Sequence, residues 1–361
     1  MPDPARSAQP TNPPAQAQPA SAVQSLAAAE ALDVRRLGAF LRRRLRHGGE
    51  IRLSDVAAVA QGLSRDHFLF DLEWSSGGQR RREPLVLIRD GERPGQTDRG
   101  KELRLLRKLE QTDVPAPRAF WRDTSGRWLQ RPFIIMERVR GNTTPPFTIA
   151  YEDDPEARER LAERFLDILV RIHTLNWRRL RLHFLGVPPC APADYAAHRL
   201  ADAEAAVAQA AGAQMEPQVA RAFAWCRDHT PLTRALALCH GDYKPDNVMH
   251  EDGRVIAVID WERAHIGDPM VDLAYVCLPY LSAGGLVVGL MERQRFLDAY
   301  EKGTGFRIDE ETIRFWQLFL LVITIYYFKS LITAAQERGL EPPPLEPFIT
   351  LQLGLIDAAL G

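Results

Sequence analysis

The segment 238–262, LCHGDYKPDNVMHEDGRVIAVIDWE, constrains the fold of this chain more than any other segment. It holds six acidic residues, two histidines and one asparagine around two short apolar runs. Asp252 and Gly253 at its centre predict a two-residue β-turn, because this dipeptide tolerates the positive φ that both turn positions require. Residues 247–260 are therefore predicted to form an antiparallel hairpin.

The register of this hairpin brings oxygen-bearing side chains to its open end. The predicted cross-strand pairs are His250 with Val255, Val248 with Ala257, and Asn247 with Val258. Asp260 lies two residues beyond the last pair, about 7 Å at the rise of a strand. Asp242 precedes the same end by a short loop. The sequence therefore predicts that Asn247, Asp260 and Asp242 converge.

These three side chains suit a magnesium site, because Mg²⁺ prefers a few carboxylate or amide oxygens together with phosphate and water. His240, Asp242 and Asn247 follow the H-x-D-x4-N spacing of kinase catalytic loops, and Asp260 stands where kinases carry their metal-binding aspartate. The alternative is a polar loop whose aspartates serve only as turn and cap residues. The joint spacing favours the catalytic interpretation.

The stretches HGDYKPDN and VIDWE resemble the aminoglycoside phosphotransferase and choline kinase-like superfamily, whose members are relatives of protein kinases. DWERAHIGDPMVDLAYV is similar to the narrower branch related to acyl-CoA-dehydrogenase-fused phosphotransferases. The resemblance covers nearly all of residues 31–345. It implies an α+β, two-lobed protein-kinase-like fold, with a small antiparallel-sheet N-lobe and a larger, mainly helical C-lobe.

The resemblance also implies roles for the residues of this segment. Asp242 is expected to be the catalytic base, Asn247 and Asp260 the magnesium ligands, and His240 a scaffold of the catalytic loop. Lys244 is expected near the transferring phosphate, although an exposed loop lysine without a role fits its position equally well.

Nucleotide-binding residues are expected in the N-lobe. AQGLSRD lies between two predicted strands, where Gly62 would allow close approach to phosphate and Ser64 could donate a hydrogen bond. An ordinary hairpin turn is the alternative. Arg89 ends the strand PLVLIR and is expected to bind phosphate, with Glu102 on the next helix as its partner. Surface charges at the ends of these elements are the alternative.

The segment FIIMERV is expected to form the hinge between the lobes, with the backbone around Glu137 and Val139 contacting adenine. We therefore expect the whole chain to divide into three parts: a disordered tail at 1–28, an N-lobe at 29–138 and a C-lobe at 139–361. The tail is rich in Pro, Ala, Gln and Ser and has too few large apolar groups to offset the entropy of ordering.

The expected elements follow hydrophobic periodicity along the chain. Strands are predicted within 51–89 and 131–141, with SSGGQRRRE as a turn-rich connection. Helices are predicted at 34–45, 97–110, 157–175 and within 194–229. The apolar run 315–328 is too short to span a membrane, which needs roughly 20 residues, and is predicted to be a core helix.

Composition excludes several partner classes. The formal net charge of -1 over 361 residues gives no general attraction to nucleic acid or to an anionic membrane. Four cysteines without a C-x-x-C pair predict small buried thiols in a reducing, cytoplasmic compartment. A monomer or a homodimer is expected.

The predicted function is ATP- and Mg²⁺-dependent phosphorylation of a hydroxyl on a small molecule. The branch resemblance implies a hydroxyacyl-CoA or a related catabolic metabolite as acceptor. An aminoglycoside or macrolide antibiotic kinase is one alternative, although charges within 198–229 are nearly balanced and a polycation requires an acidic pocket. A nucleotide-binding pseudokinase scaffold is the other alternative.

Overall fold

The computed structural model describes residues 32–45, 50–59, 65–76, 78–90, 98–211, 215–337, 339 and 341–361. The tail expected at 1–28 lies outside the described residues. The same is true of Gly62 and Ser64, the residues predicted for the phosphate loop.

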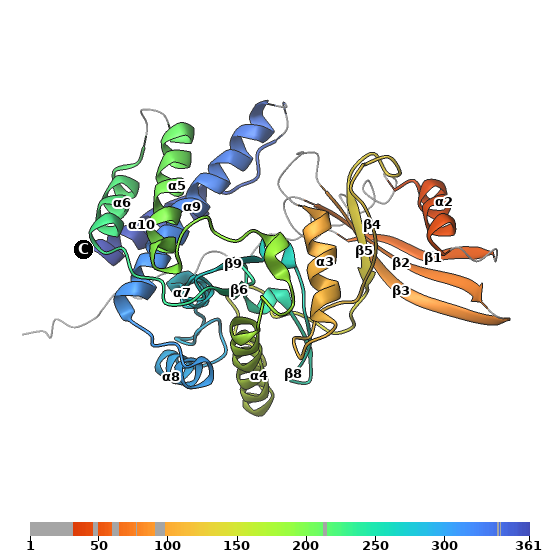
Figure 1. The fold of residues 1–361 in the computed structure, drawn as a ribbon, viewed down its shortest axis with the longest axis horizontal. Coiled ribbons are helices and arrows are strands. Elements are labelled where there is room, and N and C mark those ends of the chain that lie inside the picture. Colours follow the sequence, from red (N-terminus) through yellow and green to blue (C-terminus); the bar gives the residue numbers. More distant parts are fainter. Residues whose placement is uncertain are drawn as a thin grey trace, which may run out of the picture.

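An antiparallel sheet of five strands forms the smaller lobe, in the order β1-β2-β3-β5-β4 (Figure 1). The strands are β1 (Ile51–Val59), β2 (Arg65–Ser76), β3 (Gln79–Asp90), β4 (Ala119–Asp123) and β5 (Phe133–Glu137). The predicted alternation in β2 is confirmed, because Phe68, Phe70 and Leu72 are all buried on one face.

Two helices cover the two faces of this sheet. α2 (Val34–Leu45) forms where the sequence predicted it, and the ring of Phe40 packs edge-on against Phe133 at 5.0 Å. α3 (Arg99–Leu109) lies between the sheet and the larger lobe (Figure 1). Strand β5, which lies between β3 and β4, alternates between both sides: Phe133 joins the core under α2, and Ile134 joins the core that α3 shares with the larger lobe.

One prediction in this lobe was wrong, and one strand was missed. The connection SSGGQRRRE is mostly strand, because β2 and β3 remain paired up to Ser76 and Gln79. The arginines of this stretch are exposed along the first residues of β3, so their side chains do not oppose pairing of the backbone. Strand β4 was missed, since AFWRD is short and alternates poorly.

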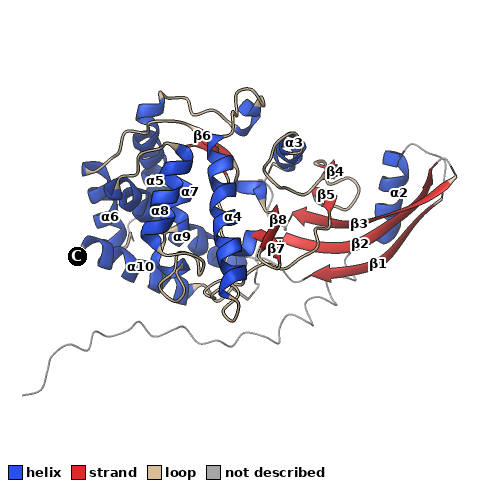
Figure 2. Cartoon of the chain, turned by 90° about the horizontal axis from the view of Figure 1, so that it is seen from below, coloured by secondary structure: helices blue, strands red, loops and turns tan. Residues whose placement is uncertain are grey.

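The larger lobe is mainly helical, as predicted (Figure 2). Its α-helices are α4 (Pro155–Thr174), α5 (Tyr195–Ala211), α6 (Pro217–Asp228), α7 (Met270–Val276), α8 (Arg293–Thr304), α9 (Glu310–Glu337) and α10 (Glu346–Leu360). Two short strand pairs accompany them: β6 (Ala237–Cys239) with β9 (His265–Gly267), and β7 (Val248–Glu251) with β8 (Arg254–Val258).

α9 contains the apolar run 315–328. By length and composition alone it is the one described helix that meets the requirements of a membrane span. Its residues Phe315, Trp316 and Leu318 are fully buried, and the helix packs against α7, α10 and α6. This packing agrees with the predicted core helix.

The four cysteines are free thiols. Cys226, Cys239 and Cys277 are buried, as predicted. The prediction was wrong for Cys190, which is partly exposed on the segment between α4 and α5.

The predicted hairpin is β7 and β8, and its turn residues Asp252 and Gly253 both have positive φ, at 50° and 73°. His250 pairs with Val255, as predicted. A bulge between Met249 and His250 then shifts the register by one residue. The expected pairs of Val248 with Ala257 and Asn247 with Val258 were therefore wrong.

Candidate active site

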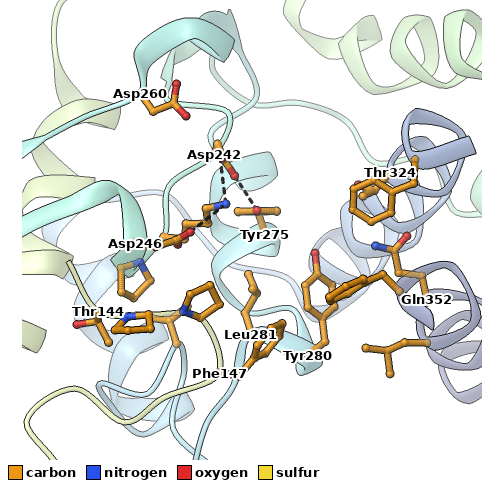
Figure 3. Close-up of a pocket in the computed structure, with 18 of the residues that line it drawn as sticks. Thr144, Phe147, Asp242, Asp246, Asp260, Tyr275, Tyr280, Leu281, Thr324 and Gln352 are labelled. Carbon is orange, nitrogen blue, oxygen red and sulfur yellow. Dashed lines mark hydrogen bonds and ion pairs between the residues drawn. The ribbon is translucent and has the colours of Figure 1, made fainter. Parts of the chain in front are cut away.

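The catalytic-loop segment runs from the end of β6 to the start of β7. Gly241 has φ of 81°, and a Cβ atom there would lie 2.6 Å from the carbonyl oxygen of Arg263. Only glycine fits this close approach. The tight turn directs Asp242 into a cavity of the larger lobe (Figure 3).

The carboxylate of Asp242 is held at both oxygens. The Tyr275 hydroxyl donates to Oδ1 at 2.7 Å, and Nδ2 of Asn247 donates to Oδ2 at 3.0 Å. Nζ of Lys244 lies 3.3 Å from Oδ2. Burial opposes ionisation of Asp242, but the charges of Lys244 and Arg263 and the Tyr275 hydrogen bond outweigh it and lower its pKa. The group is therefore a carboxylate at neutral pH.

Asn247 and Asp260 lie together at the open end of the hairpin, as predicted. The backbone of Ile259 donates to the Asn247 carbonyl at 2.9 Å, which fixes the two segments side by side. Asp260 adopts a left-handed conformation with φ of 65° at the residue before the short helix Trp261–Arg263. An amide oxygen and a carboxylate in this position fit the donor set of Mg²⁺.

A cation from the other lobe already contacts this end of the site. Nη1 of Arg65, the first residue of β2, lies 3.2 Å from Oδ1 of Asp260, and its guanidinium also pairs with Glu262. The Arg65 side chain is 7% exposed. Glu262, two residues after Asp260, is thereby held in an ion pair. Arg65 itself was not singled out, although it lies within AQGLSRD, the stretch predicted as the phosphate loop.

His240 is a buried part of the loop framework. Its Nε2 lies 3.0 Å from the Ile259 carbonyl, which can only accept, so Nε2 carries the proton. Nδ1 then accepts from the backbone of Asp242 at 3.2 Å. A neutral imidazole satisfies both contacts, in agreement with the predicted scaffold role.

Asp272 on α7 holds the same loop in place through the backbone of the loop. Its carboxylate accepts from the backbone of His240 at 2.6 Å and of Gly241 at 2.8 Å, and Nε2 of His173 lies 3.2 Å away. His173, Cys239 and Asp272 could in principle hold a metal ion, since their donor atoms lie within 4.8 Å of one another. The carboxylate is already committed to two backbone donors, so this cluster fits a structural role instead.

Lys244 lies between two carboxylates at the mouth of the cavity. Nζ is 3.3 Å from Asp242 and 3.3 Å from Asp246. Burial alone would lower the pKa of Lys244, but the two carboxylates raise it above the ordinary value. A fixed cation beside Asp242 fits the predicted contact with a transferring phosphate.

Arg89 and Glu102, two of the residues predicted for nucleotide binding, have defined partners. Nη2 of Arg89 lies 2.7 Å from Asp66, which also pairs with Arg131 at 2.5 Å. Glu102 was expected to pair with Arg89, but its described partner is the fully buried Arg99, at 2.5 Å. Arg99 precedes Glu102 by three residues, so both project from one face of α3.

The predicted hinge follows β5. The backbone N–H of Glu137 donates to the Arg118 carbonyl at 2.9 Å, so an adenine contact there would use the Glu137 carbonyl. Val139 is partly exposed two residues later. The linker then joins the hairpin, where Asn142 and His250 exchange two backbone hydrogen bonds of 2.9 and 2.8 Å.

The cavity beside Asp242 has a volume of about 440 Å³. Its acidic residues lie at the catalytic end, and its other walls are mainly apolar and aromatic (Figure 3). These walls are formed by Pro145, Pro146, Phe147, Tyr280, Leu281, Val288, Tyr327, Phe328, Leu345, Phe348 and Leu351. The residues come from the post-hinge segment, the loop after α7, and the helices α9 and α10.

Residues 55–316 match the sequence model of the phosphotransferase enzyme family. The chain belongs to this family. As a member it is a small-molecule kinase, and the predicted kinase-like fold is confirmed by its structural relatives.

One such relative is a protein of Ralstonia eutropha JMP134 that has been provisionally assigned as an aminoglycoside phosphotransferase. Its TM-score is 0.68 at 20% identity, with 91% of this chain and 97% of that chain covered. The aminoglycoside phosphotransferase APH(4)-Ia, in a ternary complex with AMP-PNP and hygromycin B, gives a TM-score of 0.59 at 17% identity. The coverage is 90% of this chain and 97% of that chain. At these identities the likeness concerns the fold alone.

Sequence relatives include acyl-CoA dehydrogenase family member 10 of Mus musculus, which is 29% identical over 188 residues and 50% of this chain. Acyl-CoA dehydrogenase family member 11 of Homo sapiens is 31% identical over 170 residues and 46% of this chain. The matches span 16% and 21% of the length of these two relatives. The predicted resemblance to this branch is confirmed.

Proposed function

We propose that this chain transfers the γ-phosphate of ATP to a hydroxyl of a small acceptor bound in the cavity beside Asp242. The observation that carries the proposal is the ionised Asp242 carboxylate, oriented by Tyr275 and Asn247 and directed into that cavity. A carboxylate at this position accepts the hydroxyl proton as the hydroxyl oxygen attacks phosphorus. The bond between the γ-phosphorus and its bridging oxygen breaks, and ADP leaves.

Asn247 and Asp260 would hold Mg²⁺ in this reaction, and their oxygens match its preferred ligands. The bound ion would neutralise charge on the transferring phosphate. Lys244 lies beside Asp242 and lines the same cavity, so its ammonium is available to the phosphate oxygens. Arg65 must release Asp260 before the ion can bind there.

The acceptor that the cavity fits best is a hydroxylated molecule with an apolar body. The four acidic residues that line the cavity already have cationic partners: Lys244 pairs with Asp242 and Asp246, and Arg65 pairs with Asp260 and Glu262. The remaining walls offer apolar contact. A hydroxyacyl thioester, or a related catabolic metabolite, has this character and agrees with the relatedness to acyl-CoA dehydrogenase family members.

An aminoglycoside kinase is the second candidate, and the fold shared with APH(4)-Ia supports it. A polycationic drug requires unpaired carboxylates in its pocket, whereas each of the four acids here already has a cationic neighbour within the chain. A pseudokinase is disfavoured by the complete set of Asp242, Asn247 and Asp260.

The test is magnesium-dependent transfer of labelled γ-phosphate to pooled acceptors: hydroxyacyl thioesters, aminoglycosides, macrolides and sugars. We expect product from the thioester pool, and at least about a hundredfold lower turnover for Asp242→Asn, in the range for loss of a general base. A near-wild-type rate in Asp242→Asn would refute the role of this carboxylate. Product from the aminoglycoside pool alone would favour the second candidate.

A further inference from the structure

A second cavity adjoins the acceptor cavity in the larger lobe. It has a volume of about 270 Å³, and it shares four lining residues with the acceptor cavity: Arg263, Tyr275, Thr324 and Tyr327. Tyr275 and Thr324 are labelled in Figure 3, and the Tyr275 hydroxyl donates to Asp242. The two cavities therefore meet beside the proposed catalytic base, so that one acceptor can extend from the first into the second.

The second cavity, which we call the basic cavity, carries positive charge. Arg199 lines it from α5, and Arg263 lines it from the short helix Trp261–Arg263. His265 adds no charge at neutral pH, because burial lowers its pKa. In the described chain no aspartate or glutamate lines this cavity. Its other polar side chains are hydroxyls and one indole, from Tyr195, Tyr275, Thr324, Tyr327 and Trp316.

Both guanidinium groups lie against α9, which forms one wall of the basic cavity. Cζ of Arg199 is 5.8 Å from the ring centroid of Phe319, and Cζ of Arg263 is 5.2 Å from the ring centroid of Tyr327. Both rings line the basic cavity. The Arg199 side chain is 43% exposed, and Arg263 is exposed as well. A ligand can therefore reach both charges.

The chain leaves these two charges available to an anion. No described carboxylate forms an ion pair with Arg263, although its charge acts on the nearby Asp242. Nη1 of Arg199 lies 3.9 Å from Asp202 on the same helix, but both side chains are about half exposed, and such surface pairs contribute little. A cavity whose charged groups have one sign attracts ions of the opposite sign.

We propose that the basic cavity binds an anionic group of the acceptor, a carboxylate or a phosphate, while the hydroxyl to be phosphorylated lies at Asp242 in the neighbouring cavity. This rests on the proposed function, because it treats the cavity beside Asp242 as the acceptor site. It narrows the substrate class to hydroxylated molecules with an apolar part and a negative charge. The charge can come from a free carboxylate or from a phosphate on the thiol of a thioester.

The first experiment measures binding without turnover, by isothermal titration in the presence of Mg-ADP. Its ligands are hydroxyoctanoate with a terminal hydroxyl and the octanediol of the same length, together with shorter and longer pairs. We expect wild type to bind the acid at least about tenfold more tightly than the diol at the best chain length, the scale of one hydrogen bond to a charged group. Arg199→Gln and Arg263→Gln should each lose most of this preference.

The matched control is Arg178→Gln. The Arg178 guanidinium also lies over a ring, 4.2 Å from the centroid of Trp177, but the residue lines neither cavity. This variant should keep the wild-type preference. An equal loss in all three variants would mean that overall charge decides binding, and would overturn the proposal.

The second experiment tests phosphate as the source of the charge. It compares hydroxyacyl thioesters of phosphopantetheine and of pantetheine, which differ by one phosphate, each with the hydroxyl on several different carbons. If the phosphate occupies the basic cavity, its thioester should have a KM at least about tenfold lower, and both arginine variants should lose the difference.

The outcomes separate this proposal from the proposed function. Equal affinity for charged and neutral ligands in both experiments would overturn the anion site, whether or not phosphate is transferred. A preference that survives in both arginine variants would do the same. Binding of an anion that depends on both arginines, without phosphate transfer to any of these molecules, would support the anion site and refute the proposed acceptor class.

Discussion

The hydroxyl of Tyr275 donates to Oδ1 of Asp242 at 2.7 Å, from a residue 33 positions further along the chain. Burial and then the Asp242 charge raise the pKa of Tyr275 well above its ordinary value, so the hydroxyl stays protonated and remains a donor. With Asn247 holding the other oxygen, the carboxylate has one fixed orientation. The α7 helix thereby sets the direction in which the proposed base faces the acceptor.

We predict that Tyr275→Phe lowers kcat by about tenfold, the scale of one hydrogen bond to a charged group, and leaves the KM for ATP unchanged. The lost bond favoured the ionised form of Asp242, so the pKa of Asp242 should rise. The acid limb of the kcat profile should move to higher pH. Tyr280→Phe, on the wall of the same cavity, is the control and should retain wild-type kcat. Equal kcat values for the two variants would contradict the orienting role.

Arg65 gives a prediction about metal binding. Its guanidinium contacts Asp260 and Glu262, the place where Mg²⁺ is proposed to bind, so ion and arginine compete. We expect Arg65→Gln to bind Mg²⁺ severalfold more tightly than wild type when nucleotide is absent, because the competing cation is removed. Isothermal titration with MgCl₂ measures this directly.

The control for Arg65 is Arg131→Gln. Arg131, two residues before β5, pairs with Asp66 at 2.5 Å and has no described contact with Asp260. Its removal should leave Mg²⁺ affinity unchanged. Weaker Mg²⁺ binding by Arg65→Gln than by wild type would show that Arg65 supports the metal site instead of competing for it.

The core of the site could be predicted because it is local in the sequence. Asp242, Asn247 and Asp260 are joined by one loop and one hairpin, and the Asp252-Gly253 turn fixes how the hairpin closes. The bulge after Met249 was not predicted; it lies where the backbone of His250 also pairs with Asn142, a residue of the linker between the lobes that is distant in the sequence.

The residues that sequence reasoning missed come from distant elements. Tyr275 and Arg65 reach the site from α7 and β2, and no spacing rule connects them to Asp242. Arg99 was missed for another reason: a buried arginine on a helix is recognised only once its partners Asp90 and Glu102 are seen beside it. Such contacts depend on tertiary packing, which local periodicity does not specify.

Asp272 gives a prediction about stability and pH. Burial alone would raise the pKa of Asp272, but the hydrogen bond and charge of His173 outweigh it and lower the pKa below the ordinary value. A carboxyl group with a depressed pKa stabilises the fold above its unfolded-state pKa, and this contribution is lost as pH falls through the folded-state pKa. We expect Asp272→Asn to lower the free energy of unfolding at pH 7 by about 3 kcal/mol, the scale for breaking a buried pair.

The same variant should differ less from wild type in acid. Below about pH 4 the wild-type carboxyl group begins to lose its advantage, so the two denaturation midpoints should approach each other. Urea titrations of both proteins at pH 7 and at about pH 3 measure the difference. A gap that widens as the pH falls would contradict a depressed pKa for Asp272.

Gly253 gives a prediction about the hairpin that carries the site. Its φ is 73°, and a Cβ atom would lie 2.4 Å from the backbone oxygen of Ala157 at the start of α4. Gly253→Ala therefore combines left-handed strain with a collision against backbone, and we expect a loss of about 3 kcal/mol or more in the free energy of unfolding. Gly285→Ala isolates the strain, since Gly285 has φ of 76° with no atom within 4 Å of the added carbon. That control should lose about 1 kcal/mol. Equal losses in the two urea titrations would mean that the turn can move away from α4, in which case Asp260 is not fixed by this packing.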